Sequence, residues 1–162
     1  DAVVSGQTWH WVDPVAGAAQ AARVLRPGGR LAVFWNVGRP PAELVEAFVD
    51  VYRRMLPEPL ASRASSAYSQ NGYGVFTTKA VDGIRRAGGF GEPEEWRFEW
   101  DRTYTRDEWL DALPTSGAVA LLSGSALDEI MTGVGAAIDA VGGVFTLRYT
   151  AVVVTAVRTA SD

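Results

Sequence analysis

The feature that most constrains the fold of this chain is a strand–helix–strand unit within its first 36 residues. Ala2–Val4 is a short, β-branched apolar run that stops at Ser5-Gly6, as a buried strand does. Asp13-Pro14 matches a helix N-cap followed by proline, and apolar residues at helical spacing come next. After the Pro27-Gly28-Gly29 turn, Arg30–Asn36 is apolar on both faces, which is typical of a central parallel strand. Together these segments predict a right-handed βαβ crossover.

The remaining sequence continues the same layered α/β pattern. Glu94–Tyr104 alternates apolar and polar residues and predicts a strand with two unlike faces. Thr105 and Glu108 form a capping-box motif that opens a further helix. The other expected segments are a helix at Ala42–Leu56, irregular chain with one short helical turn at Ala61–Thr78, a short helix at Val81–Ala87, a helical stretch at Gly117–Val141 broken near Ser123–Ser125, and a β-rich run at Val144–Thr159.

Composition excludes several classes of protein. The chain has 162 residues, 48% of them hydrophobic and 21% charged, which is ordinary for one globular domain. The absence of cysteine excludes a disulfide framework, a thiolate nucleophile and a zinc ribbon. A pI of about 5.0 argues against a nucleic-acid partner, and no apolar run approaches the roughly 18 residues that a membrane span needs. We therefore expect a cytoplasmic protein that binds neither nucleic acid nor membrane.

Two motifs in the βαβ unit resemble class I S-adenosylmethionine-dependent methyltransferases. The opening stretch Asp1–Asp13, with its Gln-x-x-His-Trp sequence, resembles the fourth strand and following loop of that family's small-molecule branch. The segment Ala22–Val33, which contains Arg-Val-Leu-Arg-Pro-Gly-Gly, resembles the family's turn into the fifth strand. The resemblance implies a Rossmann-like α/β sheet in which strands 4, 5, 7 and 6 follow one another and the last strand is antiparallel.

On this resemblance the chain is the C-terminal half of a methyltransferase domain. Residues 1–36 hold strand 4, a helix and strand 5, whereas 79–104 hold a helix and strand 6, and 142–162 hold strand 7. Residues 37–78 and 105–141 are expected as helical insertions that form a substrate lid. The family's glycine-rich cofactor loop and the acidic residue that holds the ribose are expected upstream of Asp1. Gly133-Val134-Gly135 lies in a helical segment and is interpreted as helix packing.

The resemblance implies S-adenosyl-L-methionine as cofactor and places the site at the carboxyl ends of the strands. Ser5, Gly6 and Gln7 are expected near the methionine part of the cofactor. His10 is the candidate catalytic residue, as a general base or a substrate hydrogen-bond donor. The alternative is a structural histidine packed between Trp9 and Trp11. No metal site is expected.

Five further residues are candidates for substrate contact: Trp11, Trp35, Asn36, Tyr68 and Tyr73. Trp11 could instead belong to the core. Tyr68 and Tyr73, together with Phe76, could equally pin an irregular loop to the body of the protein. Trp96, Phe98 and Trp100 share one strand face and are predicted to be core residues.

The predicted function is methyl transfer to a small molecule by the full-length protein, with this chain supplying part of the cofactor cleft and the lid. The isolated chain is expected to be inactive. Two alternatives stay open: a non-catalytic α/β binding or assembly module, and a fragment of a nicotinamide dehydrogenase. Since strand 1 of the family would pair with Ala2–Val4, we also expect self-association through that exposed strand.

Overall fold

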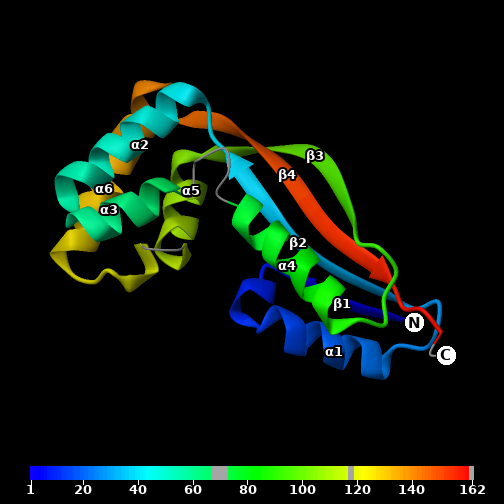
Figure 1. The fold of residues 1–162 in the computed structure, drawn as a ribbon. Coiled ribbons are helices and arrows are strands. Elements are labelled where there is room, and N and C mark those ends of the chain that lie inside the picture. Colours follow the sequence, from blue (N-terminus) through cyan, green and yellow to red (C-terminus); the bar gives the residue numbers. More distant parts are fainter. Residues whose placement is uncertain (67–72, 117–118, 161–162) are drawn as a thin grey trace. The chain divides into compact units, whose positions relative to one another are not determined.

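The computed structural model describes residues 1–66, 73–116 and 119–160, and in them the chain forms an α/β fold with a four-stranded sheet (Figure 1). The strands are β1 (Ala2–Gly6), β2 (Arg30–Arg39), β3 (Glu94–Thr105) and β4 (Val144–Val157). Their order is β1-β2-β4-β3, so the last strand of the sequence lies inside the sheet and β1 lies at an edge. Strand β2 runs three residues beyond the predicted end at Asn36.

The strand directions make the sheet a mixed one. β1 and β2 are parallel. β4 runs against β2, because Arg158 after the end of β4 bonds to Gly29 before the start of β2, whereas Gly38 near the end of β2 contacts Leu147 near the start of β4. The predicted order 4-5-7-6 with an antiparallel last strand is therefore confirmed.

The helices differ from prediction mainly in the middle of the chain. The α-helices are α1 (Pro14–Val24), α2 (Ala42–Met55), α3 (Glu58–Ser66), α4 (Gly74–Ala87), α5 (Arg106–Ala112) and α6 (Ser125–Ala140). The irregular segment predicted at Ala61–Thr78 is wrong in its described parts, which belong to α3 and α4. Serine, threonine and glycine in these parts are weak helix formers, so local propensity did not indicate the helices that form there.

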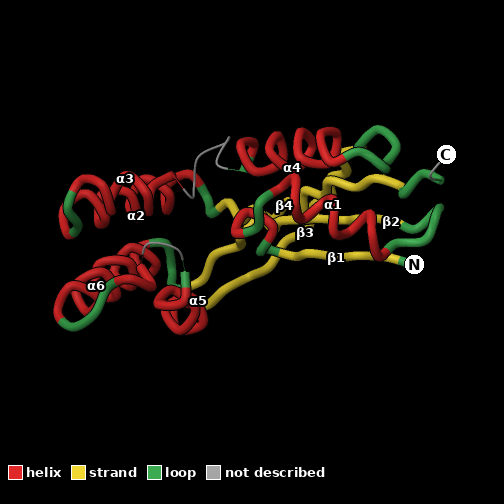
Figure 2. Tube along the Cα trace, turned by 60° about the horizontal axis from the view of Figure 1, so that its bottom comes forward, coloured by secondary structure: helices red, strands yellow, loops and turns green. Residues whose placement is uncertain are grey.

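The chain divides into two compact units. The first comprises Asp1–Val37, Tyr73–Trp100 and Thr150–Asp162, and the second comprises Gly38–Gly72 and Asp101–Tyr149. In the first unit, α1 and α4 pack on one face of the strands (Figure 2). Leu31, Val33 and Trp35 of β2 point into this layer and form its buried core with residues of α1, α4 and β4.

The other face of the strands in the first unit carries no helix from the described residues. Arg30, Ala32 and Phe34 alternate with the buried residues of β2 and so lie on this other face. Arg30 stacks over Trp96, 5.1 Å from the ring centroid, which places Trp96 there as well. Trp96, Phe98 and Trp100 are 39%, 56% and 42% exposed, so their prediction as core residues is wrong. An alternating strand shows that its faces differ, but it does not show which face is covered.

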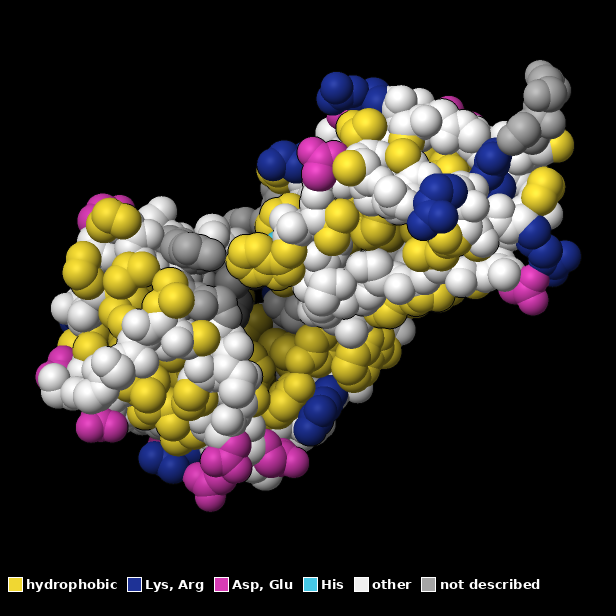
Figure 3. Space-filling model, turned by 90° about the horizontal axis from the view of Figure 1, so that it is seen from below, with side chains coloured by type: hydrophobic (Ala, Val, Ile, Leu, Met, Phe, Trp, Pro, Cys, Tyr) yellow, Lys and Arg dark blue, Asp and Glu magenta, His cyan; other side chains and the backbone are white. Residues whose placement is uncertain are grey.

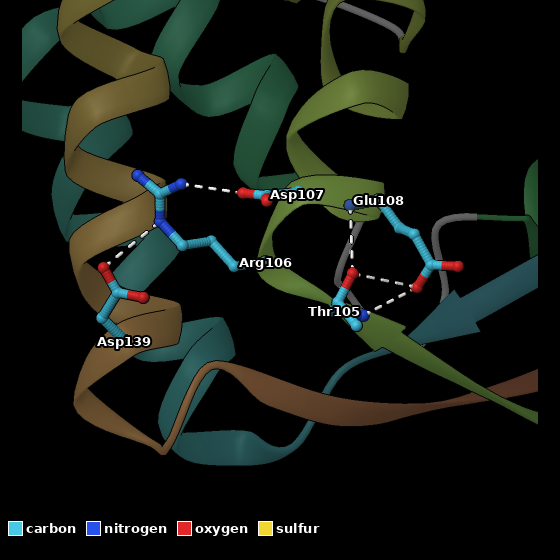
Figure 4. A network of polar contacts seen from close by, with 5 residues as sticks. All are labelled: Thr105, Arg106, Asp107, Glu108 and Asp139. Carbon is cyan, nitrogen blue, oxygen red and sulfur yellow. Dashed lines mark hydrogen bonds and ion pairs between the residues drawn. The ribbon is translucent and has the colours of Figure 1, made fainter.

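The second unit packs α2, α3, α5 and α6 around an apolar core that includes Phe48, Tyr52 and Ile130. The prediction of helix packing at Gly133 is confirmed: a Cβ built there would lie 2.8 Å from Val51 of α2. Helix α5 begins at the predicted capping box (Figure 4). The Thr105 hydroxyl accepts a hydrogen bond from the Glu108 backbone N–H at 3.3 Å, and the Glu108 carboxylate accepts one from the Thr105 N–H at 2.9 Å.

The face seen in Figure 3 bears acidic and basic side chains in small scattered groups between hydrophobic patches. Among the residues that the structure describes, no helix combines the length and apolar character needed to cross a membrane.

Candidate functional site

The first unit brings most of the predicted site residues together at the carboxyl ends of β1 and β2. The two strands are parallel, so their carboxyl ends meet at the same edge. The Gln7 N–H donates to the Phe34 carbonyl at 2.9 Å and extends the pairing by one residue beyond β1. The Gln7 side chain then reaches Asn36: its Oε1 accepts from the Asn36 N–H at 3.3 Å and its Nε2 donates to the Asn36 carbonyl at 3.4 Å. Gln7 thus ties the two strand ends to each other.

Gln7 also carries a strained backbone. Its φ is +57°, the left-handed region that residues with a side chain rarely occupy. Such a conformation costs of order 1 kcal/mol and persists only where surrounding contacts hold it. Here the holding contacts are the paired bonds to Asn36. Next to it, the Ser5 and Thr8 hydroxyls lie 2.9 Å apart in hydrogen-bond contact, which closes the turn after β1.

A short 3₁₀ helix, Trp9–Trp11, follows this turn, and its two tryptophans differ in burial. Trp9 is buried beneath α1, where its ring lies 3.0 Å from the position a Cβ on Gly17 would take. Trp11 is 75% exposed, so the alternative of a core role for Trp11 is wrong. One turn of helix thus uses one aromatic ring as an anchor and presents the other at the surface.

His10 lies between these tryptophans in sequence and is fixed by a residue of β2. The Trp35 indole Nε1 donates a hydrogen bond to His10 Nδ1 at 3.2 Å. The Trp35 side chain is fully buried, whereas His10 is exposed. The bond therefore runs from the core of the first unit to a side chain at its surface.

Aromatic rings from α4 complete the surroundings of His10. The Phe76 ring stacks on the imidazole with centroids 4.7 Å apart and an interplanar angle of 26°. Trp11 lies against the imidazole at 4.8 Å in a tilted arrangement. Tyr73 meets Phe76 edge to face at 5.7 Å, and burial raises the pKa of the Tyr73 hydroxyl. His10 is thus a polar group framed by aromatic side chains.

The structure therefore unites nearly all of the predicted site residues in one unit. Ser5 and Gly6 end β1 and Gln7 follows it, while Trp35 and Asn36 lie in the adjoining part of β2. Tyr68 lies outside the described residues. Phe76, which was not among the predicted site residues, stacks on His10 at 4.7 Å, as close as Trp11 at 4.8 Å, yet its segment was expected to be irregular. Helical spacing from Phe76 to Ala80 and Ile84, the buried face of α4, is the signal that identifies it.

The side chains at this edge can form hydrogen bonds with a ligand, and aromatic side chains lie around His10. Ser5 and Gln7 supply a hydroxyl and an amide, each able to donate and to accept. His10 adds a ring nitrogen that makes no hydrogen bond within the described residues. No acidic residue takes part in the contacts around His10, Trp35 and Phe76 that the structure describes.

Comparison with known proteins finds similarity to methyltransferases. The family model of a methyltransferase domain matches residues 1–33. An uncharacterized methyltransferase of Mycobacterium tuberculosis is 61% identical over 36 residues, which are 22% of this chain and 15% of that protein. An uncharacterized methyltransferase of Mycobacterium bovis matches to the same extent. The matched sequence thus covers the βαβ unit and a small part of each relative.

The fold has a wider match. A solved structure assigned as a type II methyltransferase from Anaeromyxobacter dehalogenans superimposes with a TM-score of 0.61 at 20% sequence identity. The match covers 99% of this chain and 66% of that one. It shows that both units of the chain occur within a methyltransferase-like α/β fold.

Proposed function

Because this chain carries, in residues 1–33, a segment of the class I methyltransferase family, we propose that its full-length protein transfers a methyl group from S-adenosyl-L-methionine to a small-molecule acceptor. One observation supports this most: the family-matching segment ends its two strands at one edge, which carries the hydroxyl of Ser5 and the amide of Gln7. Ligands of open α/β sheets bind at such edges.

The residues at the end of β1 fit the amino-acid part of the cofactor. That part carries an ammonium group, which needs acceptors, and a carboxylate, which needs donors. The Ser5 hydroxyl and the Gln7 amide supply both, and Gly6 between them adds no side chain. When bound, the cofactor supplies an activated methyl group on sulfur. The chain's own residues then bind and orient the two reactants, which is the larger part of catalysis for a displacement of this kind.

We assign the acceptor side to the aromatic surround of His10. Trp11, Asn36 and Tyr73 remain the proposed substrate contacts. Trp35 does not, because its side chain is fully buried and reaches the site only through its hydrogen bond to His10. Exposed Trp11 offers apolar surface at low conformational cost, since its side chain has only two rotatable angles. His10, between these aromatic rings, remains the proposed catalytic residue of this cluster. Residues 37–78 remain the proposed substrate lid of the full-length protein, with 105–141 as a second helical insertion.

This chain would form one wall of the cofactor cleft, and the full-length protein would add the glycine-rich loop. The support is the resemblance of the β1–β2 unit to the family's fourth and fifth strands. We therefore expect the 162-residue chain alone to bind cofactor at least 100-fold more weakly than the full-length protein does.

Titration calorimetry with S-adenosylhomocysteine tests the proposal in the full-length protein. Gln7→Ala removes the amide and both bonds to Asn36, and we expect at least tenfold weaker binding. Gln20→Ala is the matched control, since Gln20 is exposed on α1 and bonds only Arg23 among the described residues. If the full-length protein bound no S-adenosylhomocysteine, the proposed function would be refuted. Equal affinities of the two variants would remove Gln7 from the cofactor site.

A further inference from the structure

The hydrogen bond between Trp35 and His10 determines which imidazole nitrogen carries the proton. An indole Nε1–H donates hydrogen bonds and cannot accept them. His10 Nδ1, 3.2 Å from Trp35 Nε1, must therefore accept, which requires its lone pair. In a neutral imidazole with a bare Nδ1, the proton is on Nε2. We infer that Trp35 holds His10 as its Nε2–H tautomer, so that the site presents a hydrogen-bond donor to an acceptor oxygen of the bound ligand.

Burial of Trp35 makes this assignment stringent. Its side chain has no exposed surface, so water does not replace the imidazole as partner. If His10 turned its nitrogen away, the buried indole N–H would lose its hydrogen bond, and a buried donor without a partner is destabilising. The same unit shows the contrast: the indole Nε1 of buried Trp9 has no partner among the described residues. Trp35 is thus a positioning residue that acts through His10.

Stacking keeps the imidazole in the same orientation. Phe76 covers the ring at 4.7 Å, and Phe76 in turn stacks on Trp35 at 6.2 Å with an interplanar angle of 22°. Trp11 contacts the ring as well, at 4.8 Å. Nδ1 is occupied and the ring plane is held, so the polar atom left for a ligand is Nε2 with its hydrogen. The exposed His10 side chain is thus held in one orientation by its neighbours.

The tautomer decides between the two roles that the sequence left open for His10, general base and hydrogen-bond donor, in favour of the donor. A general base at Nε2 needs a free lone pair, whereas this Nε2 already holds a proton. The ligand class that fits is a molecule with an oxygen acceptor beside apolar or aromatic surface, because Trp11 and Phe76 flank the donor. Carboxylate, phenolate and carbonyl oxygens share this chemistry. The inference rests on the proposed function only in taking that ligand to be the methyl acceptor.

Nuclear magnetic resonance of the ¹⁵N-labelled chain tests the tautomer without any ligand. His10 is the only histidine, so its two ring nitrogens give unambiguous signals. We expect Nε2 to be protonated, Nδ1 to be bare, and a scalar coupling across the hydrogen bond to link Nδ1 to one indole Nε1–H. Trp35→Phe should abolish that coupling, and Trp11→Phe, which alters a ring in contact with His10 but not its bond, should preserve it. A protonated Nδ1 in the wild-type chain would overturn the inference, whatever the variants do.

A pair of probes tests the ligand class in the same spectra. Benzoate carries acceptor oxygens on an aromatic ring, and benzylammonium carries donors on the same ring. We expect benzoate to shift the Nε2–H signal of His10 and benzylammonium to leave it unmoved. The reverse order, equal shifts or no shift with either probe would refute the ligand class. Failure of the full-length protein to bind S-adenosylhomocysteine would leave both results standing, so the two proposals fail separately.

Discussion

Helices α1 and α4 of the first unit approach each other closely at Gly83, and Gly83→Ala measures how rigid that contact is. Gly83 lies in the interior of α4 and is buried against the start of α1. A Cβ built on it would lie 2.6 Å from both the Cβ and the carbonyl oxygen of Pro14. Ordinary van der Waals contact begins near 3.4 Å, so α4 would have to move by roughly 0.8 Å. Backbone and a proline ring cannot rotate away, unlike a flexible side chain.

Two opposed terms set the size of the effect. Replacing glycine by alanine in a helix interior stabilises by about 1 kcal/mol. Overpacking a rigid contact costs about 1–3 kcal/mol, and the upper half of that range applies where backbone blocks relaxation. The free energy of unfolding should therefore fall by about 1–2 kcal/mol. Gly74→Ala is the control, because Gly74 begins α4 and a Cβ there would meet nothing within 4 Å.

Urea denaturation of the 162-residue chain, followed by far-ultraviolet circular dichroism, gives the comparison. We expect a lower midpoint for Gly83→Ala, an unchanged slope, and a midpoint for Gly74→Ala at or slightly above that of the wild type. If Gly83→Ala were as stable as Gly74→Ala, the two helices would not be in the close contact described, and the reasoning would be refuted.

Three further predictions concern other parts of the chain. Thr105→Ala removes the capping box, and the free energy of thermal unfolding should fall by about 1 kcal/mol. Hydrogen bonds from the Thr105 backbone and hydroxyl lower the pKa of Glu108 below its ordinary 4.5, so the stability that the Glu108 carboxylate contributes is present above pH 4.5 and is lost as the pH falls through the lowered pKa. The wild type should therefore lose more stability on acidification than the variant. Val4→Lys, at a 63% exposed position on edge strand β1, should reduce self-association in sedimentation velocity, while Val24→Lys on α1, similarly exposed, should not; equal behaviour would exclude pairing through β1. In urea denaturation, Trp9→Phe should lower the free energy of unfolding by about 1 kcal/mol less than Trp35→Phe does. The indole N–H of Trp9 has no partner among the described residues, whereas that of Trp35 donates to His10. An equal loss in the two variants would show that the Trp9 N–H does make a hydrogen bond.

Local signals in the sequence were enough to predict the βαβ unit. The Asp13 side chain accepts from the N–H groups of Val15 and Ala16, as its place before a proline indicates. Gly28 adopts a φ of +80°, which is the turn geometry that Pro27-Gly28-Gly29 predicts. These interactions span a few residues, so they can be read from the chain directly. The sheet order followed from the family resemblance.

Features that depend on distant residues could not be predicted. The alternation over Trp96–Trp100 is correct, but the exposure of that face depends on where α1 and α4 pack. The tautomer of His10 depends on Trp35, 25 residues away in the sequence. The position of Phe76 required α4 to begin at Gly74, where the local sequence is small and polar. Sequence reasoning thus located the site through its strand ends and missed the side chains that orient it.

The place of β4 in the sheet bears on how this chain folds. β4 lies between β2 and β3, although more than 100 residues separate its start from the end of β2. Contacts between residues so distant in sequence close slowly, because a long loop must first lose its freedom. During synthesis, β3 has no neighbour until β4 emerges, and its four aromatic side chains stay accessible to other chains. Folding of the sheet is thus completed by the last strand, and the interval before it is when aggregation competes most strongly.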